Sequence, residues 1–127
     1  MLKEKKFSLQ SSMDKASLMH GVLTEHKAKE ISFYALPQGN PLADIVILCT
    51  ATSARHGRSL ADAVVQSCKD NNLEHLHTEG YAEGEWILVD LNDIILHIFQ
   101  EAIKERYKIE EILADATSFI PGPDQNS

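Results

Sequence analysis

The 127-residue sequence has no apolar run near the roughly 18 residues that a membrane-spanning helix needs. Its Lys-rich start is not followed by the apolar region of a signal peptide. These two absences predict a cytoplasmic protein with no membrane partner.

The sequence also has few cysteines and lacks a glycine-rich loop. The chain has two cysteines, Cys49 and Cys68, and their spacing matches no paired motif. Cys49 falls in an apolar, strand-like run and Cys68 in a helix-like run, so reduced structural thiols are favoured over a disulfide or a metal site. No Gly-rich loop or phosphate-loop Lys is present. We therefore expect no cofactor.

Length and composition fit one domain. The 127 residues are 43% hydrophobic and 24% charged, which suffices for a real core. The first ten residues are Lys-rich and aperiodic, and after Thr117 the chain runs into Pro121, Gly122 and Pro123. We place the domain at residues 11–116 and predict loose termini at residues 1–10 and 117–127.

Acidic residues concentrate in one part of the chain. Residues 79–115 contain three Lys or Arg and ten Asp or Glu, and this excess equals the net charge of −7 of the whole chain. Nucleic-acid binding relies on Lys and Arg that neutralise phosphates, so the acidic segment argues against direct nucleic-acid binding. It favours a basic protein surface as the partner.

Residues 80–107 organise the chain. Two strand-like runs, 85–90 and 93–99, are rich in β-branched and aliphatic residues. If Leu91 and Asn92 form the loop, the cross-strand pairs are Trp86 with His97, Leu88 with Ile95, and Asp90 with Asp93. These six residues then share one mixed face, our candidate partner-binding surface, while the opposite aliphatic face is core. A three-residue bulged loop would slip the pairing by one.

Trp86 is the only Trp in the chain. A lone Trp usually packs in the core. Its neighbours Glu83, Gly84 and Glu85 indicate a strand end near solvent, where Trp is a favoured interface anchor. We therefore interpret Trp86 as the apolar anchor of the mixed face.

The remaining elements predict an α/β or α+β fold. Ser11 or Ser12 can cap a helix that continues to about residue 27. Residues 31–36 and 43–50 form an antiparallel hairpin whose second strand is apolar enough for the middle of the sheet. Ser53 caps a second helix that ends near residues 71–72, and a strand at 75–79 follows. Residues 100–107 and 109–114 read as a broken last helix. The sheet is mixed, with about five strands flanked by helices.

Two polar clusters suggest ligand sites, and each has a plainer interpretation. His75, His77 and His97 could form a zinc site, but a His-x-His on a short polar strand usually faces solvent. Residues 50–53 before a helix resemble an anion cradle, with Arg55 adding charge. Ser53 as a simple helix cap is the favoured explanation of that turn.

Two arrangements could support catalysis. Asp44, Asp90 or Asp93 could hold magnesium in a nucleotide-acting enzyme, but Asp90 and Asp93 lack the i, i+2 spacing that places carboxylates on one strand face. Ser53, His97 and Asp90 could form a hydrolase triad, but no nucleophile elbow precedes Ser53. We expect a protein that is not an enzyme and has no metal site, and we keep the magnesium-dependent enzyme as the alternative.

Several segments, in this order, resemble the Iojap family, whose bacterial members are ribosomal silencing factors (RsfS). They are residues 43–44, 50–56, 79–80, 86–90, 93–97 and 106–107. The resemblance covers about residues 13–114 and is most specific over residues 79–107. The chain departs from the family at Ala51, where Gly is common, and at Leu113, where Trp is frequent.

This resemblance implies a fold similar to nucleotidyltransferases without known catalysis. It implies a translation repressor that binds the large ribosomal subunit through its fourteenth protein and blocks joining of the small subunit when nutrients fall. It also implies a possible homodimer of the free protein. The residues expected to contact the partner are those of the mixed face, with Trp86 as anchor, Asp90 and Asp93 facing Arg or Lys, and His97 as their polar neighbour.

Overall fold

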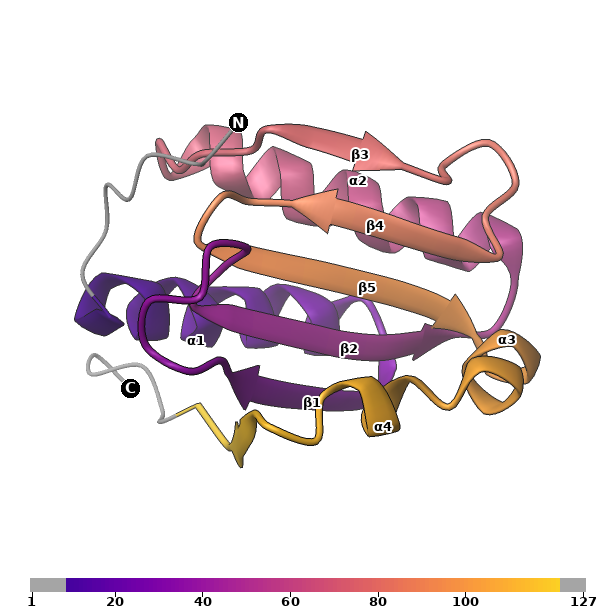
Figure 1. Ribbon diagram of the computed structural model, residues 1–127. Coiled ribbons are helices and arrows are strands. Elements are labelled where there is room, and N and C mark those ends of the chain that lie inside the picture. The colour runs from indigo at the N-terminus through magenta and orange to yellow at the C-terminus, as the bar shows by residue number, and fades with distance from the viewer. Residues whose placement is uncertain (1–8, 122–127) are drawn as a thin grey trace.

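The computed structural model describes residues 9–121, except for the side chains of residues 9, 10, 106, 107, 110 and 112. One six-stranded sheet runs through the molecule, with its strands in the order β3-β4-β5-β2-β1-β6 (Figure 1). The elements in chain order are α1 (Leu9–Glu25), β1 (Lys29–Ala35), β2 (Ile45–Ala51), α2 (Ala54–Asp70), β3 (His77–Glu79), β4 (Trp86–Asp90), β5 (Ile94–Gln100), α3 (Glu101–Tyr107), α4 (Ile109–Ile112) and β6 (Thr117–Phe119).

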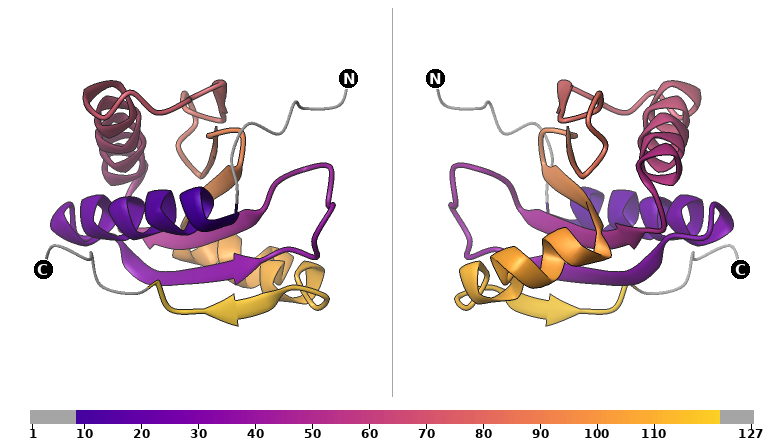
Figure 2. Two further views of the ribbon diagram at one scale, coloured as in Figure 1. Left: turned by 90° about the vertical axis from the view of Figure 1, so that its left-hand side faces the viewer. Right: turned by 90° about the vertical axis from the view of Figure 1, so that its right-hand side faces the viewer.

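The helices divide between the two faces of the sheet. Helices α1 and α2 lie side by side on one face, and the short helices α3 and α4 lie on the other (Figure 2). The main core fills the space under α1 and α2, where strand residues such as Ile47, Ile87 and Leu96 are fully buried. A smaller cluster around Val46, Leu48, Phe99 and Ile109 packs under α3 and α4. Helices α3 and α4 cover only part of their face of the sheet.

The first hairpin and the central strand are confirmed. Strand β1 pairs antiparallel with β2, and β2 pairs parallel with β5, so the sheet is mixed as predicted. Every residue of β2 is buried, because helices or the smaller cluster cover both of its faces. The apolar run at residues 43–50 indicated this position.

Helix α2 also follows its sequence signals. Ser53 has an extended backbone, and its hydroxyl accepts a hydrogen bond from the N–H of His56, as an N-cap does. Leu60, Val64 and Cys68 recur at helical spacing and are buried against the sheet. Both cysteines are free and buried, as expected. The last helix breaks at Lys108, whose left-handed φ of 48° separates α3 from α4.

The ordered elements extend past both predicted domain boundaries. Helix α1 begins at Leu9, so neither Ser11 nor Ser12 is its cap, and that prediction was wrong. Ser12 is buried inside the helix, and its hydroxyl contacts carboxylates on distant segments. At the other end, Thr117–Phe119 forms β6 on the edge of β1. Phe119 packs on Phe33 with ring centroids 5.7 Å apart, which fixes a strand where we expected a loose end.

The predicted register of the β4–β5 hairpin was wrong by two residues. The observed partners are Trp86 with Phe99, Leu88 with His97, and Asp90 with Ile95. The turn is longer than two residues, because Leu91 N donates to Ile94 O and Asp90 Oδ1 accepts from Asn92 N. Asn92 adopts φ 78°, the left-handed conformation that we expected it to tolerate. A slip of two preserves the strand faces, since side chains alternate with a period of two.

Candidate functional site: a groove on the open sheet face

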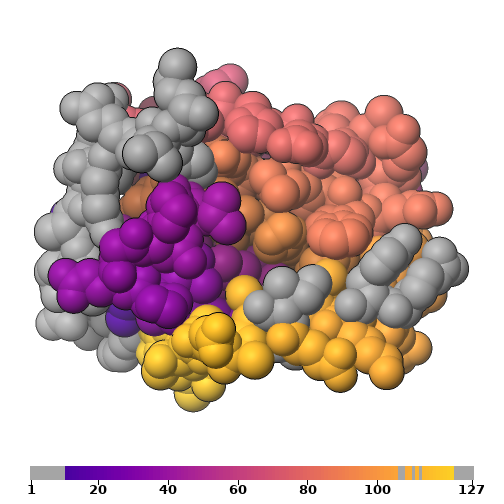
Figure 3. All heavy atoms as spheres, viewed as in Figure 1, coloured from indigo at the N-terminus to yellow at the C-terminus, as the bar shows by residue number. Residues whose placement is uncertain are grey.

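A groove of about 490 Å³ lies on the sheet face opposite α1 and α2. In the space-filling view this face is hollowed between the 36–44 segment, strands β4 and β5, and the segment that follows α3 (Figure 3). Its lining residues are Leu36, Asn40, Leu42, Val46, Leu48, His77, Glu79, Trp86, Leu88, Asp90, Ile95, His97, Ile109 and Leu113. Most of these side chains are apolar, and the polar ones come mainly from β3, β4 and β5.

The strand registers arrange the groove in two rows. One row runs across the sheet through His77, Asp90, Ile95 and Val46, which are successive partners on β3, β4, β5 and β2. The next row runs through Glu79, Leu88, His97 and Leu48. Five of the six residues predicted for the mixed face therefore come together: Trp86, Leu88, Asp90, Ile95 and His97.

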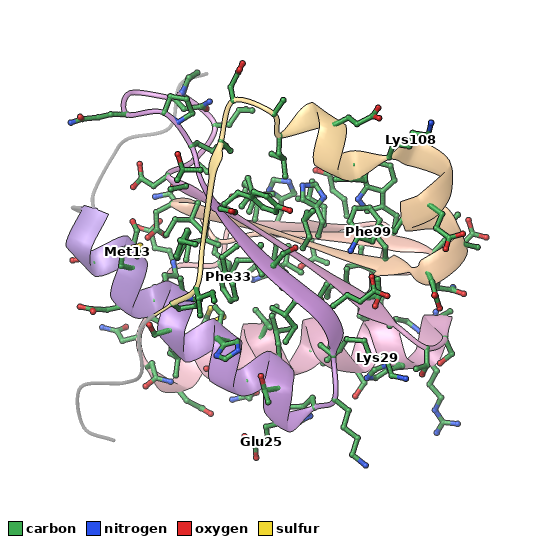
Figure 4. All side chains as sticks on the ribbon, turned by 90° about the horizontal axis from the view of Figure 1, so that it is seen from below. Met13, Glu25, Lys29, Phe33, Phe99 and Lys108 are labelled. Atoms are coloured by element: carbon green, nitrogen blue, oxygen red, sulfur yellow. The ribbon has the colours of Figure 1, made fainter. Side chains whose placement is uncertain are left out.

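Trp86 is half-buried at one end of the groove. Its ring lies 5.0 Å from that of Phe99, its direct partner across β4 and β5. Its Nε1 donates to Nδ1 of His97 at 3.0 Å, which is a diagonal contact across the same two strands. Figure 4 shows Phe99 on the side of the sheet that faces α3. Trp86 therefore belongs partly to the smaller core and partly to the groove wall.

Burial controls the charge state of His97. The ring stacks on Phe99 with centroids 5.8 Å apart and planes inclined by 10°. Its strand partners are Leu88 and Leu48, so few water molecules can solvate an imidazolium there. Burial lowers the pKa of His97 to about 4. The imidazole is therefore neutral at pH 7.

An acidic rim lies along β3 and β4. Asp90 is nearly buried, and its Oδ2 lies 3.7 Å from Nδ1 of His77. The other ring nitrogen of His77, Nε2, lies 2.7 Å from Oε2 of Glu79. Glu79 is well exposed, whereas Asp90 is fixed by the N–H of Asn92. The groove thus combines an apolar floor with two carboxylates at one edge.

Asp93 is not part of this face, so its assignment to the mixed face was wrong. Its Oδ1 lies 2.8 Å from Nζ of Lys15, and both side chains are almost fully buried under α1. The Ser12 hydroxyl lies 2.9 Å from Asp93 Oδ2 and 3.0 Å from Asp44 Oδ2. The longer turn explains the error, because it removes Asp93 from the strand pairing and places its side chain on the helical side.

The same contacts separate the residues of the magnesium alternative. Asp44 and Asp93 meet at Ser12 under α1, while Asp90 lines the groove on the other face. Lys15 already neutralises Asp93 at short range. Among the described residues, no group of three or more His, Cys, Asp or Glu is arranged to hold a metal ion.

The residues of the other ligand and catalytic alternatives make local contacts with different neighbours. His75 bonds to Thr78, His77 to Glu79 and His97 to Trp86, so the three imidazoles each have a different neighbour. The Ser53 hydroxyl caps α2 by accepting from His56 N. The His56 ring in turn contacts Thr52 N and the carbonyl of His26, which ties this turn to the end of α1.

Several residues that line the groove were not predicted from the sequence. His77 and Glu79 alternate on one short strand, which was a usable signal for a shared face. Leu36, Asn40 and Leu42 come from the segment between β1 and β2, and no local pattern indicates that this segment borders β4 and β5. Leu42 is 67% exposed although it lines the groove.

The fold and this groove define an α+β domain whose open sheet face carries a largely apolar groove with an acidic rim. Within residues 9–121, no helix is both long and apolar enough to cross a bilayer.

Comparison with known proteins identifies the family. The family model described as "Ribosomal silencing factor during starvation" matches residues 9–126. The ribosomal silencing factor of Haemophilus influenzae is 33% identical over 88 residues, which cover 69% of this chain and 86% of that protein. The one from Chromobacterium violaceum is 30% identical over 90 residues, covering 71% and 74%. The chain belongs to the ribosomal silencing factor family.

Solved structures show the same fold. A crystal structure of a Chromobacterium violaceum protein superposes with a TM-score of 0.77 at 24% identity, covering 94% of this chain and 97% of that one. A Bacillus halodurans structure gives a TM-score of 0.69 at 22% identity, covering 82% of this chain and 96% of that one.

Ribosomal silencing factors are ribosome-binding factors rather than enzymes, and membership of this family implies association with the large ribosomal subunit.

Proposed function

We propose that this protein represses translation by binding the fourteenth protein of the large ribosomal subunit and so blocking the joining of the small subunit. Family membership supports large-subunit association. The assignment to the fourteenth protein and to subunit joining follows from the resemblance over residues 79–107. These residues form the end of β3, the β4–β5 hairpin and α3. The family's description places such factors in starvation, so we assign repression to nutrient limitation and to the cytoplasm.

A relative from mouse supports the choice of subunit. Its printed name is "Mitochondrial assembly of ribosomal large subunit protein 1". It is 20% identical over 98 residues, which cover 75% of this chain and 43% of that protein. The name describes the mouse protein, and its connection with the large subunit is what we extend to this chain.

The groove is the observation that carries the proposal. Its apolar floor can accept an aliphatic side chain, and Asp90 and Glu79 at its edge can receive Arg or Lys. Asp90 is already desolvated, so a basic side chain that reaches it gains a short, charge-assisted contact. Ribosomal proteins that contact RNA carry many basic residues, so this chemistry fits a ribosomal protein surface. We assign partner contact to Trp86, Leu88, Asp90, Ile95 and His97, without Asp93.

The same face also supports a homodimer of the free protein, which we propose as a competitor of the ribosome. An apolar groove with an exposed Leu42 at its border can be covered by a second copy or by the ribosomal protein, but not by both. Sedimentation with increasing amounts of large subunits tests this competition. The dimer should disappear as the complex forms, and a dimer that binds subunits intact would contradict it.

The test of the main proposal uses purified components. The chain is titrated with the isolated fourteenth protein, and joining of small and large subunits is followed by light scattering. We expect direct binding and a joining rate that falls as the chain saturates large subunits. Binding to large subunits with unchanged joining, or with no affinity for the fourteenth protein, would contradict the proposal.

A further inference from the structure

The two ring nitrogens of His97 are in different environments. Nε1 of Trp86 donates to Nδ1 at 3.0 Å. An indole N–H can only donate, so Nδ1 must be the unprotonated nitrogen. A neutral imidazole with a bare Nδ1 carries its proton on Nε2. The contact with Trp86 therefore selects one tautomer of His97.

Packing holds this ring in place. It stacks on Phe99 at 5.8 Å, and Leu88 and Leu48 lie beside it on β4 and β2. The other titratable groups of the groove are His77 and Glu79 on β3 and Asp90 on β4. The described side chains that α3 and α4 place in the adjoining cluster, Ile103 and Ile109, are apolar. The imidazole is thus an oriented, neutral group in a mostly apolar wall.

Its second nitrogen is left for an occupant of the groove. In the part of the chain that the structure describes, the imidazole ring of His97 makes its hydrogen bond through Nδ1 alone. His97 lines the groove, so an occupant there can reach the Nε2–H. A donor in an apolar wall favours an occupant that brings an acceptor, because an unmet polar group there would cost binding energy.

We infer that His97 is a specificity-determining residue whose Nε2–H donates to a neutral acceptor, a backbone carbonyl, of the bound ribosomal protein. This inference rests on the proposed function. An anionic acceptor is disfavoured because Glu79 and Asp90 flank the same groove. A cationic side chain has no lone pair to offer. A carbonyl next to an apolar side chain satisfies both the donor and the apolar floor.

The tautomer is tested on the free protein by nitrogen-15 NMR of the imidazole at pH 7. We expect a bare Nδ1 and a protonated Nε2, and a donor-acceptor coupling to the Trp86 indole. The opposite tautomer, a mixture of tautomers or an imidazolium would overturn the inference. This measurement needs no ribosome, so its result is separate from that of the proposed function.

The donor role is tested with two variants. His97→Asn keeps an acceptor for Trp86 and removes the distal donor, whereas His97→Gln can place an amide N–H near the position of Nε2. Urea unfolding first establishes that each variant folds. We expect His97→Asn to bind large subunits about tenfold more weakly, the effect of one hydrogen bond, and His97→Gln to recover much of this loss.

The outcomes separate the two claims. Equal binding by wild type and His97→Asn, or an equal loss in both variants, would overturn the donor role while wild-type binding upholds the proposed function. Wild-type protein that does not bind large subunits would overturn the proposed function and the inference with it.

Discussion

Lys15 and Asp93 form an ion pair of 2.8 Å that is buried between α1 and the β4–β5 turn. Lys15 Nζ also donates to the carbonyl of Leu91 at 2.8 Å and to that of Glu74 at 3.3 Å. One side chain of α1 thus contacts two later segments of the chain, the one that follows α2 and the β4–β5 turn. The acidic residue that we had assigned to the partner surface instead holds the fold together.

Asp93→Asn should destabilise the protein strongly. The change leaves the Lys15 ammonium buried without its counter-charge, which typically costs about 3–5 kcal/mol. Urea unfolding measures this loss. The matched control is Glu30→Gln, which removes the more exposed Lys104–Glu30 pair at 3.3 Å and should cost under about 1 kcal/mol. Equal losses in the two variants would show that the buried pair has no special role.

Stability should fall in mild acid because of His97. Its pKa is lowered by burial from 6.5 to about 4, so below pH 6.5 the unfolded state binds a proton that the folded state does not. The stabilisation is complete above pH 6.5 and is lost as the pH falls through 4. Its size is about 3 kcal/mol, at about 1.36 kcal/mol for each unit of pKa difference.

The check is a comparison of urea-unfolding free energies from pH 7.5 to 4. Carboxylates titrate in the same range, so the quantity that matters is the difference between wild type and His97→Asn. Wild type should lose more stability than the variant between pH 6.5 and 4. Parallel curves would mean that His97 titrates alike in both states.

Two Gly→Ala substitutions should change the stability of the fold in opposite directions. Gly80 has φ 76°, and an added Cβ would overlap the carbonyl oxygen of Trp86, so Gly80→Ala should cost about 2 kcal/mol or more. Gly21 is exposed within α1 and has nothing within 4 Å of an added Cβ, so Gly21→Ala should stabilise by about 0.5–1 kcal/mol. Thermal unfolding distinguishes the two variants. If Gly80→Ala were as stable as wild type, the close approach of residue 80 to the Trp86 carbonyl at the start of β4 would be contradicted.

Trp86→Ala should weaken both folding and binding. The indole is half-buried on Phe99, so its loss should cost about 1–3 kcal/mol of stability, less than a fully buried Trp. As an interface anchor it should also weaken subunit binding about thirtyfold. Unfolding and co-sedimentation are measured on the same variant, with Tyr81→Ala as an exposed aromatic control outside the groove. A variant whose folded fraction binds normally would assign Trp86 to the core alone.

Local patterns predicted much of the fold and five of the fourteen residues that line the groove. Alternation placed Trp86, Leu88 and Asp90 on one face of β4, and a register error of two could not change that face. The Ser53 cap and the helical spacing of Leu60, Val64 and Cys68 defined α2, because both signals lie within a few residues. Each of these features is determined by residues that lie close together in the sequence.

The errors came from contacts between distant segments. Ser12 meets Asp93 across 81 positions, so nothing near either residue predicts that they share a buried site. Strand β6 depends on the contact of Phe119 with Phe33. The groove likewise depends on Leu42, from the segment between β1 and β2, lining the same hollow as residues of β4 and β5. Sequence periodicity contains no information about such pairings, since it reports which face is apolar and not what covers it.

The most direct test of the groove as the ribosome-binding surface compares two exposed aliphatic residues. Leu42 is 67% exposed and lines the groove, whereas Ile120 is 90% exposed and does not line it. Neither side chain is part of the buried core, so Leu42→Lys and Ile120→Lys should both fold like wild type.

Co-sedimentation with isolated large ribosomal subunits then measures binding of the two variants at equal concentrations. A lysine at position 42 adds positive charge to a site that faces a basic partner, so Leu42→Lys should bind at least about tenfold more weakly than wild type. Ile120→Lys should bind within about twofold of wild type. Undiminished binding by Leu42→Lys, or an equal loss in both variants, would contradict the assignment of this groove to the ribosome.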